Sequence, residues 1–132
     1  MVSSINQLAD ISKIYSPEQV IILTIAADKL CTKHLPRALW KFSKCICGLE
    51  NSSYFHKVIF EDMMMFDEAK VADELLTVFK HACNENTRAL LLECTNMPPY
   101  KLNLKQFKDI KTFDILSAIE TLLPNTVDPA YL

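Results

Sequence analysis

Hydrophobic and polar positions along this chain form two kinds of pattern, short continuous apolar runs and stripes with helical spacing. The continuous runs predict four strands, over residues 18–25, 44–49, 88–94 and 111–115. The stripes predict helices over residues 3–14, 28–40, 51–60 and 67–84, with a further helix that ends at Leu123. Pro36 lies inside the second stripe, so that helix is expected to kink or end near Leu35.

The order of these elements predicts the fold class. Strands that are separated by helices pair in parallel, and the helices form crossovers that cover the sheet. We therefore expect an α/β fold, a three-layer sandwich with a short, mostly parallel sheet of about four strands flanked by helices. With 132 residues, the chain is expected to form one domain, residues 1–132.

Composition and charge narrow the classes of partner. The net charge of -2 and the lack of a dense Lys/Arg run argue against nucleic acid. The longest apolar run, Val20 to Ile25, is too short to cross a membrane, and the N-terminal residues do not have the pattern of a secretory signal. The one glycine, Gly48, argues against a phosphate-binding loop, because neither GxGxxG nor GxxxxGK[ST] is present.

The cysteines indicate a reducing compartment rather than a set of structural disulfide bonds. Their number, 5, is odd and no CxxC pair occurs, so we expect reduced thiols and a cytoplasmic protein. Cys31 and His34 share a helical face, but no spacing matches a zinc pattern, and we expect no metal site. The other cysteines apart from Cys94 are expected to be small core residues.

Candidate chemistry is concentrated in residues 88–101, "RALLLECTNMPPYK". Cys94 follows a predicted strand, and parallel sheets bind ligands at the carboxyl ends of their strands. The turn from Thr24 to Asp28 is expected at the same edge. From the residues alone, Cys94 is either a small buried side chain or a thiol whose pKa is lowered by helix N-terminal amides, with Thr95 or Asn96 as the helix cap.

The motif "LLLECTNMPPY" resembles the second catalytic-cysteine motif of the aspartate/glutamate racemase superfamily, in its hydantoin-racemase-like branch. Four further segments resemble that branch: "VSSINQL", "QVIILTIAADKLCTKHL", "CGLENSSYFHKVI" and "KTFDILSAIETL". The resemblance thus covers nearly the whole chain.

This resemblance implies two similar lobes with the active site between them and a mechanism without cofactors. One thiolate takes the α-proton of an amino acid while a thiol on the opposite face returns one. Cys94 would be the second-lobe member of that pair. Thr95 and Asn96 would contact the substrate, a small amino acid or carboxylate, and Thr24 would line the pocket. Thr95 has the alternative role of a helix cap.

The chain also departs from the family pattern. The family's first catalytic cysteine precedes the "VSS" segment, which here directly follows Met1, so we expect a truncated protein with one of the two thiols. Inversion at carbon needs groups on both faces, and one lobe cannot close over a substrate. Little or no racemase activity is therefore expected from this chain alone.

In the family that the chain resembles, the C-terminal strand and helix, residues 111–123 here, pack with the first lobe, so we expect them to lack that usual sheet. Their apolar face, together with the methionines of "FEDMMMFDE", predicts an interface. We expect a homodimer, an exchanged segment, or a complementary first-lobe chain. Three hypotheses follow: a racemase-family half, a pseudoenzyme that binds a small carboxylate or a protein, and an unrelated α/β interaction domain with a chance motif.

Overall fold

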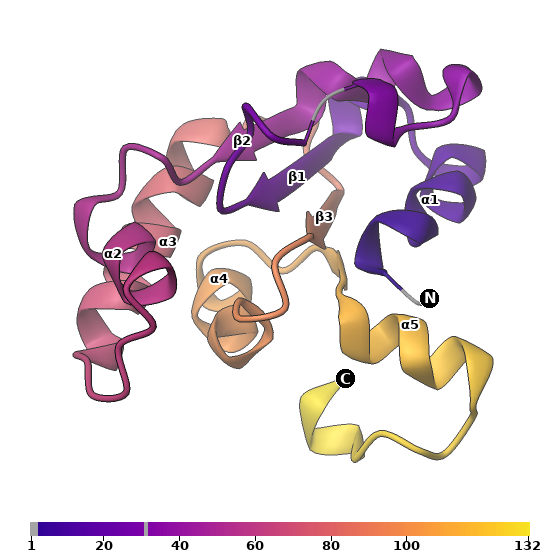
Figure 1. The fold of residues 1–132 in the computed structure, drawn as a ribbon. Helices are drawn as coiled ribbons and strands as arrows, with labels where there is room; N and C mark the ends of the chain where they lie inside the picture. The colour runs from indigo at the N-terminus through magenta and orange to yellow at the C-terminus, as the bar shows by residue number, and fades with distance from the viewer. Residues whose placement is uncertain (1–2, 31) are drawn as a thin grey trace.

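The computed structural model describes residues 3–30 and 32–132, and a four-stranded sheet forms its centre (Figure 1). The strands are β1 (Val20–Thr24), β2 (Ile46–Gly48), β3 (Ala89–Leu92) and β4 (Lys111–Phe113). All pairings are parallel, in the order β2-β1-β3-β4. The predicted α/β class with a short parallel sheet is confirmed.

Helices cover both faces of this sheet. The α-helices are α1 (Leu8–Ile14), α2 (Ser53–Phe60), α3 (Glu68–Ala82), α4 (Lys101–Phe107) and α5 (Ile115–Leu122). Short 3₁₀ segments are η1 (Ser4–Gln7), η2 (Pro17–Gln19), η3 (Thr32–His34), η4 (Arg37–Cys45), η5 (Pro98–Tyr100) and η6 (Pro129–Tyr131). No helix in the described part of the chain has the length and apolar character needed to cross a bilayer.

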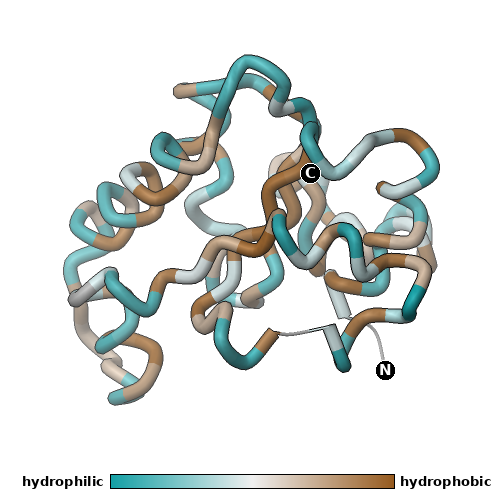
Figure 2. Tube along the Cα trace, turned by 90° about the horizontal axis from the view of Figure 1, so that it is seen from above, coloured by the Kyte–Doolittle hydropathy of each residue, from teal (hydrophilic) through white to brown (hydrophobic). Residues whose placement is uncertain are grey.

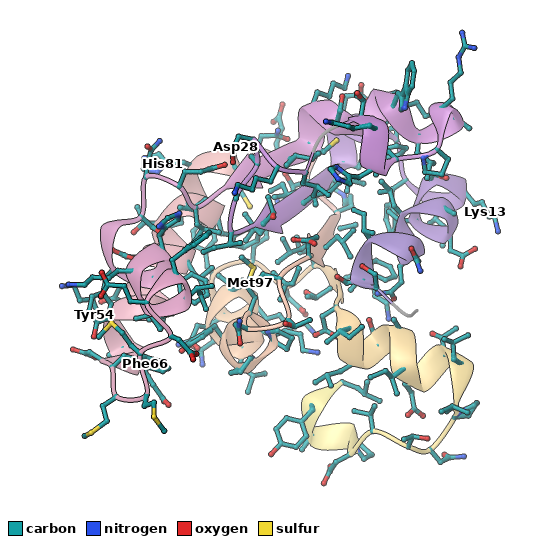
Figure 3. All side chains as sticks on the ribbon, in the orientation of Figure 1. Lys13, Asp28, Tyr54, Phe66, His81 and Met97 are labelled. Carbon is teal, nitrogen blue, oxygen red and sulfur yellow. The ribbon has the colours of Figure 1, made fainter. Side chains whose placement is uncertain are left out.

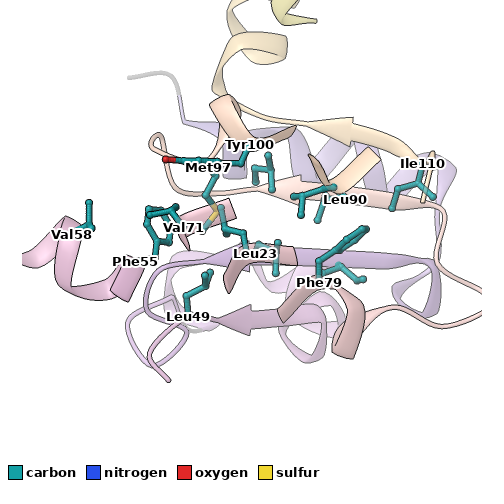
Figure 4. Close-up of a cluster of buried hydrophobic side chains, with 14 residues drawn as sticks. Leu23, Leu49, Phe55, Val58, Val71, Phe79, Leu90, Met97, Tyr100 and Ile110 are labelled. Atoms are coloured by element: carbon teal, nitrogen blue, oxygen red, sulfur yellow. The ribbon is translucent and has the colours of Figure 1, made fainter. Parts of the chain in front are cut away.

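The strands divide the interior into two cores, because alternate side chains of a strand point to opposite faces. Ile21 and Leu23 face the larger core, beneath α2, α3 and α4 (Figure 4). Val20 and Ile22 face the smaller core, beneath α1 and η4. Hydrophobic positions accordingly run through the middle of the trace, and hydrophilic ones gather in the peripheral loops (Figure 2). Burial on both faces explains the uninterrupted apolar runs.

The helices predicted over 51–60 and 67–84 are confirmed as α2 and α3. Asp67 caps α3 by accepting a hydrogen bond from the backbone N–H of Lys70 at 3.2 Å. The cap of α2 comes from another element, since the Glu74 carboxylate accepts the N–H groups of Tyr54 (3.0 Å) and Phe55 (2.7 Å). The two helices are therefore joined by charge-assisted hydrogen bonds as well as by apolar packing.

The helix predicted over 28–40 is wrong. In its place the chain forms the two 3₁₀ segments η3 and η4, with Pro36 between them. Proline has no N–H to donate within a helix and disfavours the helical conformation of the residue before it. The apolar spacing still has a structural role, because Leu35 and Leu39 are buried in the smaller core.

The strand predicted over residues 111–115 is present as β4, the edge strand of this same sheet. β4 pairs in parallel with β3, with Lys111 opposite Ala89 and Phe113 opposite Leu91. α5 follows β4 directly and begins at a capping box, in which Asp114 accepts the N–H of Ser117 at 2.8 Å. One flank of α5 remains uncovered, and Leu122 and Leu123 are each 61% exposed.

Candidate functional site

The carboxyl ends of β1 and β3 lie side by side and are joined by polar contacts. The hydroxyl of Thr24, buried at the end of β1, donates a 2.8 Å hydrogen bond to the carboxylate of Glu93. The hydroxyl of Ser4 donates to the backbone carbonyl of Glu93, also at 2.8 Å. Three elements thus fix the start of the turn that contains the predicted site residues, Glu93 to Asn96.

The loop after β1 is fixed by a second carboxylate. Glu50 accepts hydrogen bonds from the backbone N–H groups of Ala27 and Asp28, the latter at 3.2 Å. Gly48 makes this possible, because a Cβ atom at that position would overlap the Glu50 carboxylate. The single glycine of the chain therefore shapes the edge of the sheet near Thr24.

Cys94 is half-buried and packs against the larger core. Burial raises the pKa of its thiol, and the negative charge of Glu93 raises it further, although hydrogen bonds from Asn96 act in the opposite direction. One of these is the contact from the Asn96 amide nitrogen to the sulfur, at 4.0 Å. Of the two alternatives for Cys94, the raised pKa therefore favours the small, partly buried side chain over the thiol with a lowered pKa.

The capping roles expected for Thr95 and Asn96 are wrong. Both side chains are exposed, and the helical turn after them begins only at Pro98, with Met97 in the cap position and no side-chain cap. Met97 instead donates its N–H to the carbonyl of Cys94 at 3.1 Å, and its side chain is fully buried near α4 (Figure 3). Burial of Met97 turns the peptide so that Thr95 and Asn96 face outward.

Two hollows flank the Glu93–Asn96 turn and divide the predicted site residues between them. Thr24 and Glu93 line a hollow of about 470 Å³, which we call the Thr24 hollow. Thr95 and Asn96 line another, of about 510 Å³, which we call the Asn96 hollow. Cys94 belongs to the turn between the two and is not among the described residues that line either one. The structure therefore does not bring the predicted site residues into one pocket.

The charges that line the two hollows differ in kind. The Thr24 hollow includes Lys29 and His34 together with Glu93. The Asn96 hollow includes two acidic residues, Asp62 and Glu68, and no basic one among the described residues. A small carboxylate would be attracted to Lys29 in the first hollow and repelled from the second.

A buried ion pair, which the sequence reasoning missed, lies one strand away at the end of β4. The Lys101 ammonium contacts the Asp114 carboxylate at 2.9 Å, with side-chain exposures of 7% and 0%. Lys101 also donates to the carbonyl of Tyr131 at 2.7 Å, and Gln7 donates to the carbonyl of Asp114 at 2.7 Å. No local signal in the sequence distinguishes Lys101 from Lys105, Lys108 and Lys111, which follow it and are not buried.

The other described cysteines are partly or fully buried among core residues. Cys45, Cys47 and Cys83 are free, and burial raises the pKa of each, that of Cys45 to about 11. Within residues 3–30 and 32–132, no three His, Cys, Asp or Glu side chains lie close enough to hold a metal ion. Cys31 lies outside the described residues, so its pairing with His34 is not described.

Comparisons with protein-family models, with curated proteins and with solved structures gave no match. The resemblance to the racemase superfamily consequently stays a hypothesis that rests on the quoted residues.

Proposed function

We propose that this chain is a racemase-type lobe of the aspartate/glutamate racemase superfamily, one that binds a small amino acid or carboxylate and carries one of two catalytic cysteines, Cys94. The observation that carries the proposal is the placement of the motif. Its cysteine follows β3 at the carboxyl edge of a parallel sheet, the edge at which such sheets bind ligands.

The raised pKa of Cys94 suggests which of the two thiols donates a proton and which one removes it. Because the pKa of Cys94 is raised by burial, this thiol is suited to donate a proton rather than to abstract one. In the proposed reaction a thiolate of a complementary lobe removes the α-proton, and Cys94 delivers its own proton to the opposite face of the carbanion. Cys94 becomes the thiolate and the partner becomes the thiol. The chain alone is therefore expected to be inactive as a racemase.

A second function, a pseudoenzyme or binding module for a small carboxylate or a protein, is favoured by one observation. Thr24 and Glu93 line a hollow with Lys29, whereas Cys94 lines neither hollow among the described residues. A carboxylate held by Lys29 needs no thiol. The two functions differ in whether Cys94 matters once a ligand is bound.

Hydrogen exchange at the α-carbon tests both functions. The chain is incubated with L-aspartate or L-glutamate in deuterated buffer, alone and with a first-lobe chain from the superfamily, and loss of the α-proton signal is followed by NMR. Exchange with inversion that appears on mixing, with inversion lost in Cys94→Ser, supports the catalytic function. Ligand binding without exchange under either condition supports the binding module.

Two results would reject the catalytic proposal. One is racemisation by the chain alone, and the other is undiminished racemisation when the Cys94→Ser variant is mixed with the first-lobe chain. Both functions would be rejected if no amide resonance near Thr24 or Asn96 shifts when an amino acid or a dicarboxylate is added to the chain.

We also propose a cytoplasmic location. Four described cysteines are free thiols, as expected in a reducing compartment. The homodimer and the complementary lobe remain proposals of the same kind, with the uncovered flank of α5 as the candidate contact surface.

A further inference from the structure

The Asn96 hollow has a wall of apolar and aromatic side chains. It lies between α2, the start of α3 and the turn before α4, and its apolar lining is Phe55, Val58, Ile59, Met63, Phe66, Ala69, Ala72, Pro99 and Tyr100. Phe66 lies at the outer end of this region, beyond α2 (Figure 3). The volume of the Asn96 hollow, about 510 Å³, is in the range of small-molecule sites, roughly 300–1,000 Å³.

Two carboxylates in this lining have no countercharge. No Lys, Arg or His nitrogen lies within 4.0 Å of Asp62 or Glu68 in the part of the chain that the structure describes. The nearby Lys70 ammonium lies over the ring of Tyr54 instead, 4.4 Å from its centroid. Negative charge beside aromatic faces favours a bound cation.

A hydroxyl that opens onto the same hollow is also without a protein partner. Tyr100 as a residue is 8% exposed, and its hydroxyl forms no hydrogen bond within the described residues; since none of their side-chain oxygens is both sealed from solvent and unpaired, this hydroxyl is accessible from the hollow. The hydroxyl points away from the sheet, to the side where Val58 and Phe55 of α2 lie (Figure 4). Burial, and then the charge of Glu68, raise the pKa of Tyr100, and both residues line this hollow. A hydroxyl that faces a hollow and has no protein partner can form a hydrogen bond with a ligand's polar group.

We propose that the Asn96 hollow binds a small organic cation, an amine with an apolar body. Its ammonium donates hydrogen bonds to the Glu68 carboxylate and the Tyr100 hydroxyl oxygen, with Asp62 as a second negative charge. Its apolar body covers Phe55, Val58 and Met63. This inference does not rest on the proposed function, because Cys94 is not among the described residues that line the hollow.

An NMR titration of the full chain with 2-phenylethylammonium tests the proposal. The expected result is saturable shifts at Met63, Ala69 and Asn103, with binding about tenfold tighter than that of 2-phenylethanol, which has the same shape and no charge. 3-Phenylpropanoate is expected not to bind. Equal binding of the amine, alcohol and carboxylate, or no saturation by the amine, would overturn the proposal.

Variants locate the site. Glu68→Gln combined with Asp62→Asn is expected to weaken amine binding about tenfold, and asparagine tolerates the positive φ of 50° at residue 62. Tyr100→Phe keeps the edge-to-face contact with Phe55 and is expected to weaken binding about threefold. The matched control is Glu61→Gln, an exposed carboxylate of the same loop that pairs with Lys57 at 3.9 Å. An equal loss in this control would refute the assignment.

Two further titrations test whether amine binding depends on Cys94 and whether the hollow prefers a small amine to a lysine side chain. Cys94→Ser is expected to leave amine binding unchanged, whatever the outcome of the exchange assay. Nα-acetyl-lysinamide, which presents the ammonium of a protein side chain, is expected to bind more weakly than 2-phenylethylammonium. Tighter binding of the lysine derivative would overturn the assignment to a small amine.

Discussion

The carboxyl ends of β3 and β4 are neighbours in the sheet, but polar side chains are buried at the end of β4 and exposed at the end of β3. At the end of β4, Lys101 and Asp114 are buried together and form hydrogen bonds to several elements. At the end of β3, Thr95 and Asn96 are exposed beside a hollow, and Cys94 is half-buried.

This difference in burial distinguishes polar residues that stabilise the fold from polar residues that a ligand can contact. Buried charges are kept only where partners compensate for the loss of water, and Lys101 and Asp114 are buried against each other and bonded to groups of their own chain. Thr95 and Asn96 retain free hydrogen-bonding groups that a ligand can reach. Comparison of the two ends therefore assigns a stabilising role to the end of β4 and places the candidate site at the end of β3.

The largest expected effect comes from breaking the buried pair. Lys101→Met keeps the apolar stem but leaves the Asp114 carboxylate buried without a countercharge, and we expect a loss of about 3–5 kcal/mol in the free energy of unfolding. Urea unfolding followed by circular dichroism measures this loss. The matched control is Lys13→Met, which removes an exposed pair with Asp10 and is expected to cost about 0–1 kcal/mol. Similar losses in both variants would contradict the comparison.

A smaller effect is expected at the end of β1. Thr24→Val preserves shape but removes the hydroxyl that donates to Glu93, so we expect a loss of about 0.5–1.5 kcal/mol. Thr24→Ser keeps the hydroxyl and is expected to retain the hydrogen bond. The same unfolding measurement applies, and an unchanged stability in Thr24→Val would show that water replaces the hydroxyl fully.

The smallest effect on stability is expected from the pH dependence of Cys94. Its pKa in the folded chain lies above the ordinary value of 9.0, so the folded state keeps the thiol proton to higher pH than the unfolded state. Its contribution to stability is full below pH 9 and is lost as the pH rises through the folded pKa. Alkylation by iodoacetamide at pH 8 should be at least about threefold slower in the folded chain than in urea.

Mass spectrometry of the peptide that contains Cys94 measures this rate separately from those of the other thiols. Asn96→Leu removes an amide that lowers the pKa and is expected to slow alkylation further. Faster alkylation in the folded chain would show a stabilised thiolate and would reverse the proton-donor role of Cys94.

Elements with strong local signals were predicted well. The apolar runs around β1 and β3, and the stripe and acidic start of α3, contain enough information because burial on both faces or on one face leaves a direct pattern in the residues. The helix over 28–40 failed because Pro36 outweighed the spacing. The short run over 111–115 predicted β4, and the sheet has the expected four strands.

The sequence by itself determined the alternation of strands and helices and the position of Cys94 after a strand, because both depend on neighbouring residues. Only the tertiary structure decided that Lys101 is buried against Asp114, that Thr24 joins Glu93, and that Thr24 and Asn96 line separate hollows. These features depend on burial and charge contributed by residues far apart in the chain. The pKa of Cys94 is raised for the same reason, since the core around its sulfur is assembled only on folding.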